Sequence, residues 1–133
     1  QGRQEYTYSF LPHAGDWRNG TVQAGYELNV PLLAVAAESH PGCLGAVHSF
    51  ITVDKPNVIL DTVKKAEEGD DLIVRLYEAH GARGPATVTF DRPVVEAVEC
   101  GLLEEGDTPA GVDGNRLNFT MRPFELKTFK VSL

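Results

Sequence analysis

We predict an all-β fold, an antiparallel β-sandwich with at most one short helix, from three features of the sequence. Apolar and polar residues alternate in several strand-length stretches, as half-buried strands require. Gly, Pro, Asn and Asp residues separate these stretches. The stretches follow one another at short spacing, which is typical of sandwiches. Because 133 residues is a common size for one domain, we expect residues 1–133 to form a single sandwich domain.

The first predicted element is a strand over residues 4–10. Tyr6, Tyr8 and Phe10 alternate with polar residues, so that the three aromatic rings share one face of an extended chain. Pro12 ends this stretch.

Residues 19–29 are the one place where a helix competes with extended structure. Apolar residues fall there at helical spacing, and Asn19 or Thr21 is a suitable N-cap. Pro31 stops the helix soon afterwards. The apolar run at 31–38 is then predicted to be a strand.

The rest of the chain continues the strand pattern. Further strands are predicted over residues 48–53, 58–66, 72–77, 86–90, 94–103, 117–121 and in the run after Pro123. Residues 104–115 are polar and rich in Gly, and we expect a long surface loop there.

Composition and charge exclude several classes of partner. The net charge of -7 argues against nucleic acid and against an anionic membrane surface. No apolar run approaches the roughly 20 residues that span a bilayer, so we expect a soluble protein. Cys43 and Cys100 form no CxxC pair and are expected to be free thiols in a reducing, cytoplasmic compartment. The chain begins with Gln1 instead of Met, and we expect a piece of a longer polypeptide.

The sequence contains no recognisable catalytic or metal-binding pattern. Adjacent carboxylates at 67–68, 70–71 and 104–105 fall in predicted turns, where such groups are normally solvated. No histidine pairs with another ligand at a spacing typical of zinc sites. We therefore predict no catalytic residue, no metal ligand and no cofactor in this chain.

Three residues before the helix are candidates for contact with a carbohydrate. Trp17 can stack on a sugar ring, and His13 and Asp16 can bind hydroxyl groups beside it. The alternative is structural: Trp17 closes one end of the sandwich, and His13 holds the loop by a hydrogen bond to the backbone.

The order of several short motifs resembles the C-terminal β-domain of the α-mannosidases of glycoside hydrolase family 38. The motifs are EYTYSFLPHAGDW at 5–17, LNVPL at 28–32, VKKAEEG at 63–69, RLYE at 75–78 followed by Gly81, and PFELKT at 123–128. Each motif is weak alone, but together they extend from near the first residue to the last, and consistent signals along a chain outweigh single motifs.

The resemblance implies a large, zinc-dependent, retaining enzyme that removes α-linked mannose from oligosaccharides. It also implies that the zinc ligands and the nucleophile lie in an N-terminal catalytic domain, whose motifs do not occur here. The expected partners are that missing catalytic domain and a mannose-containing oligosaccharide.

Two functions follow as hypotheses. The first is an accessory domain of an α-mannosidase, which we expect to leave a sizeable apolar patch where its neighbour packs. The alternative is a free-standing carbohydrate-binding or adhesive β-sandwich module, whose surface should be polar except at a small site.

Overall fold

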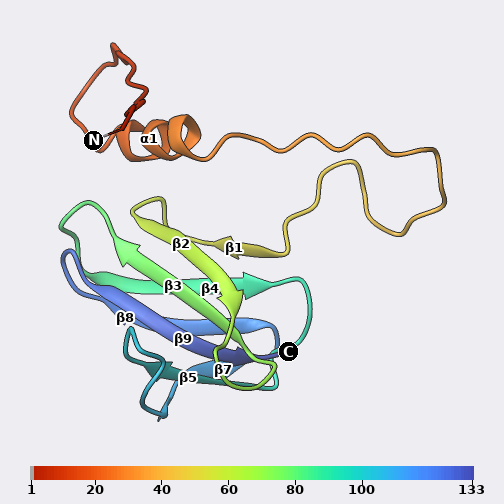
Figure 1. Cartoon of the computed structure of the whole chain (residues 1–133). Coiled ribbons are helices and arrows are strands. Elements are labelled where there is room, and N and C mark those ends of the chain that lie inside the picture. Colours follow the sequence, from red (N-terminus) through yellow and green to blue (C-terminus); the bar gives the residue numbers. More distant parts are fainter. Residues whose placement is uncertain (1) are drawn as a thin grey trace. The chain divides into compact units, whose positions relative to one another are not determined.

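The computed structural model describes residues 2–133, and the chain divides at Cys43 into two units. Residues 44–133 contain the strands, which form two antiparallel sheets (Figure 1). One sheet has the order β1-β4-β8-β7, formed by Ile51–Val53, Gly84–Phe90, Arg116–Met121 and Gly111–Asp113. The other has the order β2-β3-β9-β5-β6, formed by Val58–Lys65, Leu72–Glu78, Leu126–Ser132, Glu96–Cys100 and Thr108–Pro109.

The hydrophobic core lies between the two sheets. Alternation directs Ala86, Val88 and Phe90 of β4 inward, and all three are buried as predicted. The opposite layer contributes Phe129 of β9, whose ring lies 5.0 Å from that of Phe119 on β8. The prediction of an all-β sandwich with one short helix is therefore confirmed.

The edges of both sheets are short or irregular. β1 and β7 have three residues each and β6 has two, while the longer edge strand β2 has a register shift between Leu60 and Thr62. The expectation of a long surface loop over 104–115 is wrong in part, because β6 and β7 lie within this range. β6 pairs with β5 and β7 pairs with β8, and the polar sequence of this range does not indicate these pairings.

The N-terminal unit contains the helix α1, Thr21–Asn29. Its N-cap is Gly20, with φ 85°, and no side chain caps the first turn. The prediction of Asn19 or Thr21 as the cap is therefore wrong. The Asn19 side chain instead donates to the Ala14 carbonyl oxygen at 2.8 Å, which uses its polar group in the preceding turn. The helix ends before Pro31, as expected.

Two predicted strands are absent from the N-terminal unit. Among residues 2–50, none lies in a strand, so the predictions over 4–10 and 31–38 are wrong for this structure. The physical reason is that alternation over 4–10 and an apolar run over 31–38 indicate only which side chains avoid water, whereas a strand also needs a hydrogen-bonded neighbour. Within the described residues, no helix is long and apolar enough to cross a membrane.

Candidate functional site: two anchored loops

The three sugar-contact candidates lie in the turn before α1. His13 Nε2 is 3.2 Å from Thr21 Oγ1, and its Nδ1 is 3.3 Å from the Ala14 carbonyl oxygen. Asp16 accepts hydrogen bonds from the backbone N and the Nη1 of Arg18, at 2.9 and 2.8 Å. His13 is thus tied to the helix, and Asp16 to its own turn.

Trp17 is partly exposed beside this turn. Its side chain retains 42% of its accessible surface, and the Arg18 guanidinium carbon lies 5.2 Å from the ring centroid. Arg18 thereby joins Asp16 and Trp17, because it pairs with the first and stacks on the second. Contact of His13, Asp16 and Trp17 with a sugar stays a prediction.

A buried carboxylate, Glu78, organises one end of the sandwich. It is the last residue of β3 and shares the inward face with Leu76, as alternation predicts. Only 1% of the residue is exposed. Oε1 accepts from Asn57 Nδ2 at 2.9 Å and from the backbone N of His80 at 2.8 Å. Oε2 accepts from the backbone N of Gly81 at 2.7 Å and of Phe124 at 3.0 Å.

These hydrogen bonds keep the carboxylate ionised. Burial raises the pKa of Glu78, but hydrogen bonds from the Asn57 side chain and from backbone N–H groups, among them those of Phe124 and His80, outweigh it and lower the pKa to about 2. A carboxylate held in this way is a fixed acceptor at neutral pH. It suits the anchoring of a loop and does not suit a general acid, which must carry a proton.

The loop that Glu78 anchors is tightly constrained. Gly81 has φ 75°, and a Cβ added there would lie 3.0 Å from Phe124 Cζ. Phe124 itself has φ 55°, which is unusual for a residue with a side chain, and 68% of it is exposed. Phe124 therefore exposes a large aromatic side chain on a strained backbone, and its backbone N–H donates to the Glu78 carboxylate.

A pocket of about 220 Å³ lies beside the anchored loop. Its polar lining comes from Lys55, Asn57 and Arg83, and its apolar lining includes Val58 and Met121. Of the described residues that line it, none is a carboxylate or a histidine. The pocket can donate hydrogen bonds, but its lining lacks the usual groups for acid-base catalysis.

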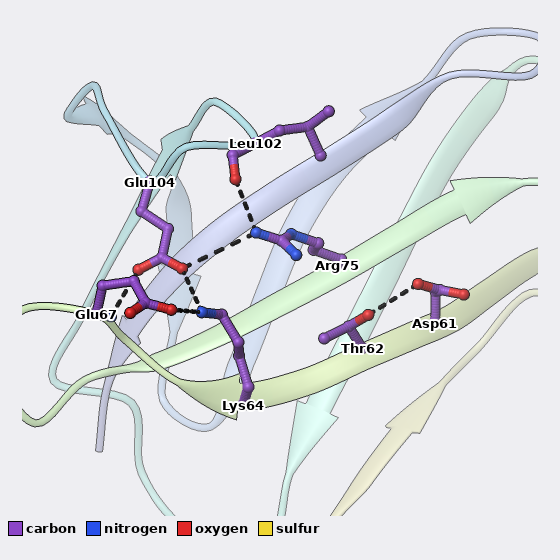
Figure 2. Close-up of polar contacts among 7 residues, drawn as sticks. All are labelled: Asp61, Thr62, Lys64, Glu67, Arg75, Leu102 and Glu104. Atoms are coloured by element: carbon purple, nitrogen blue, oxygen red, sulfur yellow. Dashed lines mark hydrogen bonds and ion pairs between the residues drawn. The ribbon is translucent and has the colours of Figure 1, made fainter.

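A second anchored loop lies on the face of the five-stranded sheet that points away from the core (Figure 2). Glu104 Oε1 pairs with Lys64 Nζ of β2 at 2.8 Å, and Oε2 accepts from the backbone N of Glu67 at 2.8 Å. Arg75 of β3 donates through Nη2 to the Leu102 carbonyl oxygen at 2.8 Å. Residues 101–106 are thereby fastened to β2 and β3.

Glu104 differs from its expected role as a solvated turn residue. Its side chain is only 7% exposed, and its backbone has φ 65°. Hydrogen bonds from Lys64 and from the Glu67 backbone lower the pKa of Glu104, and the same contact with Glu104 raises the pKa of Lys64. The prediction for this carboxylate is wrong because its cationic partners come from strands that are distant in sequence.

Burial also affects Cys100 at the end of β5. Burial raises the pKa of its thiol, which favours the protonated, less reactive form. Cys43 is exposed, and both cysteines are free. Within residues 2–133, no group of three or more His, Cys, Asp and Glu side chains is placed to hold a metal ion.

Comparison with known protein families gives a match over the sandwich. The model of the glycosyl hydrolases family 38 C-terminal beta sandwich domain matches residues 57–129, which is more than half of the chain. The chain belongs to this family. The match extends from the residue before β2 into β9, so the family 38 sandwich includes both anchored loops.

Three curated relatives match nearly the whole chain. Alpha-mannosidase 2C1 of Homo sapiens is 43% identical over 132 residues, and the same-named protein of Mus musculus is 39% identical over 140 residues. Alpha-mannosidase G of Dictyostelium discoideum is 34% identical over 140 residues. The matches cover 94%, 99% and 97% of this chain, but only 12%, 13% and 12% of the relatives. The family 38 sandwich and its N-terminal unit thus span about an eighth of the length of these relatives.

Proposed function

We propose that this chain is the accessory C-terminal part of an α-mannosidase that hydrolyses α-linked mannose from oligosaccharides. The observation that carries the proposal is the identity of 34 to 43% with three proteins named alpha-mannosidase, which extends over both units of the chain. The family 38 match over the sandwich agrees with it. The proposed partners are the remaining part of the same polypeptide and a mannose-containing oligosaccharide.

The proposal assigns the chemistry to the rest of the enzyme. We infer a zinc-dependent, retaining reaction for the parent enzyme from the family resemblance. The described residues of this chain contain no cluster suited to a metal ion, and we assign the zinc site to the remaining part of the polypeptide. The carboxylates of buried Glu78 and of half-buried Glu104 are each engaged by loop contacts, and we assign anchoring roles to both.

An apolar groove on the sandwich supports an accessory role. It has a volume of about 340 Å³, and six of its eight lining residues are apolar, the other two being Asp91 and Arg92. Phe50 is 57% exposed. An apolar groove of this kind is typical of a surface that packs against a neighbouring domain. The two free cysteines support a reducing, cytoplasmic location for the enzyme.

The proposal is tested by comparing the 133-residue chain with the full polypeptide on an aryl α-mannoside. We expect the full polypeptide to hydrolyse the substrate, to lose activity with a zinc chelator and to recover it when zinc is restored. We expect the chain alone to be inactive with or without zinc. Metal-dependent turnover by the chain would contradict the assignment of chemistry elsewhere, and a folded, zinc-loaded full polypeptide without turnover would contradict the mannosidase assignment.

The stereochemistry has its own measurement. A retaining enzyme releases α-mannose first, and the anomeric proton signals of the product distinguish it from β-mannose before mutarotation. Initial release of β-mannose would exclude a retaining mechanism while leaving the substrate assignment intact.

A further inference from the structure

The first segment of the N-terminal unit has the side-chain arrangement of a strand. Tyr6, Tyr8 and Phe10 follow one another on one side of an extended chain, with ring centroids 6.4 and 6.2 Å apart. They are 85%, 72% and 90% exposed. Three large aromatic side chains in a row form an apolar face that is normally covered in a folded protein.

The segment after α1 shows the same excess of exposed apolar surface. Leu32, Leu33 and Val35 are 100%, 93% and 87% exposed. Apolar residues here are nearly continuous, unlike the alternating pattern of residues 4–10. A continuous apolar run of strand length is typical of a strand that is covered on both faces.

The main chain of both segments lacks hydrogen-bonding partners. Across the described chain, no hydrogen bond involves the backbone of residues 4–12 or 31–38, while bonds from Asn19 N to Asp16 O and from Val30 N to Tyr26 O order the part between them. Extended backbone with free N–H and C=O groups pairs readily with another strand.

The N-terminal unit cannot cover these segments by itself. None of the described residues of α1 is buried, so the helix forms no core with its surroundings. A unit of about 40 residues is also near the lower limit for independent folding without disulfides or metals.

The similarity to longer proteins indicates which part of the polypeptide covers these two segments. The relatives match 94 to 99% of the chain, which includes these segments, whereas the sandwich model begins only at residue 57. The sandwich is described as the C-terminal domain of its family, and the relatives are about eight times longer than the chain. Because a C-terminal domain follows other parts of its polypeptide, we infer that a preceding domain covers these segments.

We propose that residues 4–12 and 31–38 are strands of a β-sheet domain that lies immediately before the sandwich in the same polypeptide. Main-chain hydrogen bonds join both segments to that sheet, and its apolar core receives the rings of Tyr6, Tyr8 and Phe10. The inference rests on the proposed function insofar as it takes the longer α-mannosidase polypeptide as the parent. It adds that the boundary between the two domains falls between residues 38 and 51.

Hydrogen exchange measured by mass spectrometry tests this assignment in the chain and in the full polypeptide. In the 133-residue chain, we expect peptides over 4–12 and 31–38 to exchange at the rate of unstructured peptide. In the full polypeptide, we expect exchange to slow by on the order of 100-fold or more, as in stable sheets. Peptides over β3 serve as the internal control and should be protected in both samples. Unprotected segments in a folded full polypeptide would overturn the proposal.

A matched pair of variants separates main-chain pairing from contact by side chains alone. Thr7 lies on the polar side of the first segment, so Thr7→Pro removes a backbone N–H without touching the aromatic face. In the full polypeptide, Thr7→Pro should abolish protection of residues 4–12, while Thr7→Ala should retain it. Equal protection in both variants would contradict strand pairing.

Two further outcomes identify the partner and separate this inference from the proposed function. Protection in the isolated chain that rises with protein concentration would indicate pairing between copies and would overturn the assignment to a preceding sheet. Hydrolysis of an aryl α-mannoside is measured on the same full polypeptide. Protection without hydrolysis refutes the mannosidase assignment alone, and hydrolysis without protection refutes the strand assignment alone.

Discussion

Replacing Glu78 by Gln should destabilise the sandwich by about 3 kcal/mol at pH 7. The isosteric amide keeps one acceptor oxygen, but its NH₂ group faces two of the four donors that the carboxylate receives. If the amide of Asn57 rotates to accept from the new NH₂ group, the His80 backbone N–H still loses its acceptor. One unsatisfied buried donor costs about 1–3 kcal/mol, and loss of charge from the remaining hydrogen bonds adds about 1 kcal/mol.

The lowered pKa of Glu78 gives a second estimate of the stability that its carboxylate contributes. A fall in the pKa of Glu78 from 4.5 to about 2 corresponds to up to about 3 kcal/mol of stability. Because the folded-state pKa is lowered, this stability is fully present above about pH 5 and is lost as the pH falls through about 2. The difference between wild type and Glu78→Gln should therefore shrink by about half between pH 7 and pH 3.

Urea unfolding followed by circular dichroism at pH 7 and pH 3 measures both effects. Trp17 fluorescence is unsuitable because the residue lies outside the sandwich unit. Glu68→Gln is the matched control, since Glu68 is exposed in the turn between β2 and β3 and should change stability by less than about 0.5 kcal/mol. Equal stability of wild type and Glu78→Gln at pH 7, or a difference independent of pH, would refute the anchoring role.

Three other predictions concern single positions. Gly81→Ala should destabilise the sandwich by about 1–3 kcal/mol in thermal unfolding, which is more than Gly69→Ala. Both glycines have positive φ, but only a Cβ at position 81 would lie close to another side chain, that of Phe124. Equal losses of stability in the two variants would contradict this close contact. Iodoacetamide should label the exposed thiol of Cys43 well before that of Cys100 at pH 8. This difference in rate should vanish when guanidinium unfolds the chain. Equal rates in the folded chain would contradict the raised pKa of the Cys100 thiol. Titration with manno-oligosaccharides should change Trp17 fluorescence saturably, if this residue contacts sugar, and a flat response would remove it as a candidate.

The strands of the sandwich could be predicted because their buried residues follow the two-residue alternation that is typical of strands. In β4 and β8 the inward residues alternate regularly, so the sequence alone indicates both the element and its buried face. The partners of Glu78 could not be predicted in the same way. Alternation places its side chain with Leu76, but its donors come from Asn57, from the following loop and from Phe124, which is 46 residues away.

Partners that are distant in sequence also explain why the predictions for Glu104 and for the N-terminal segments were wrong. Glu104 lies in a polar, Gly-rich stretch, and its cationic partner Lys64 lies 40 positions earlier, so no local signal marks this carboxylate as shielded from solvent. For Tyr6, Tyr8 and Phe10, alternation describes the face correctly but does not identify the neighbouring strand. Local sequence patterns indicate whether a side chain is apolar or polar, whereas the tertiary fold determines which residues it contacts.

The short edge strands of the sandwich have a consequence for handling the protein. β1, β6 and β7 offer two or three residues each, and the longer edge β2 combines a register shift with Lys64 and Lys65, so the sandwich presents little template for association with other chains. Residues 4–12 and 31–38 have no such protection. Aggregation of the 133-residue chain during expression should therefore begin at residues 4–12 or 31–38, the two segments that we propose are paired in the full polypeptide.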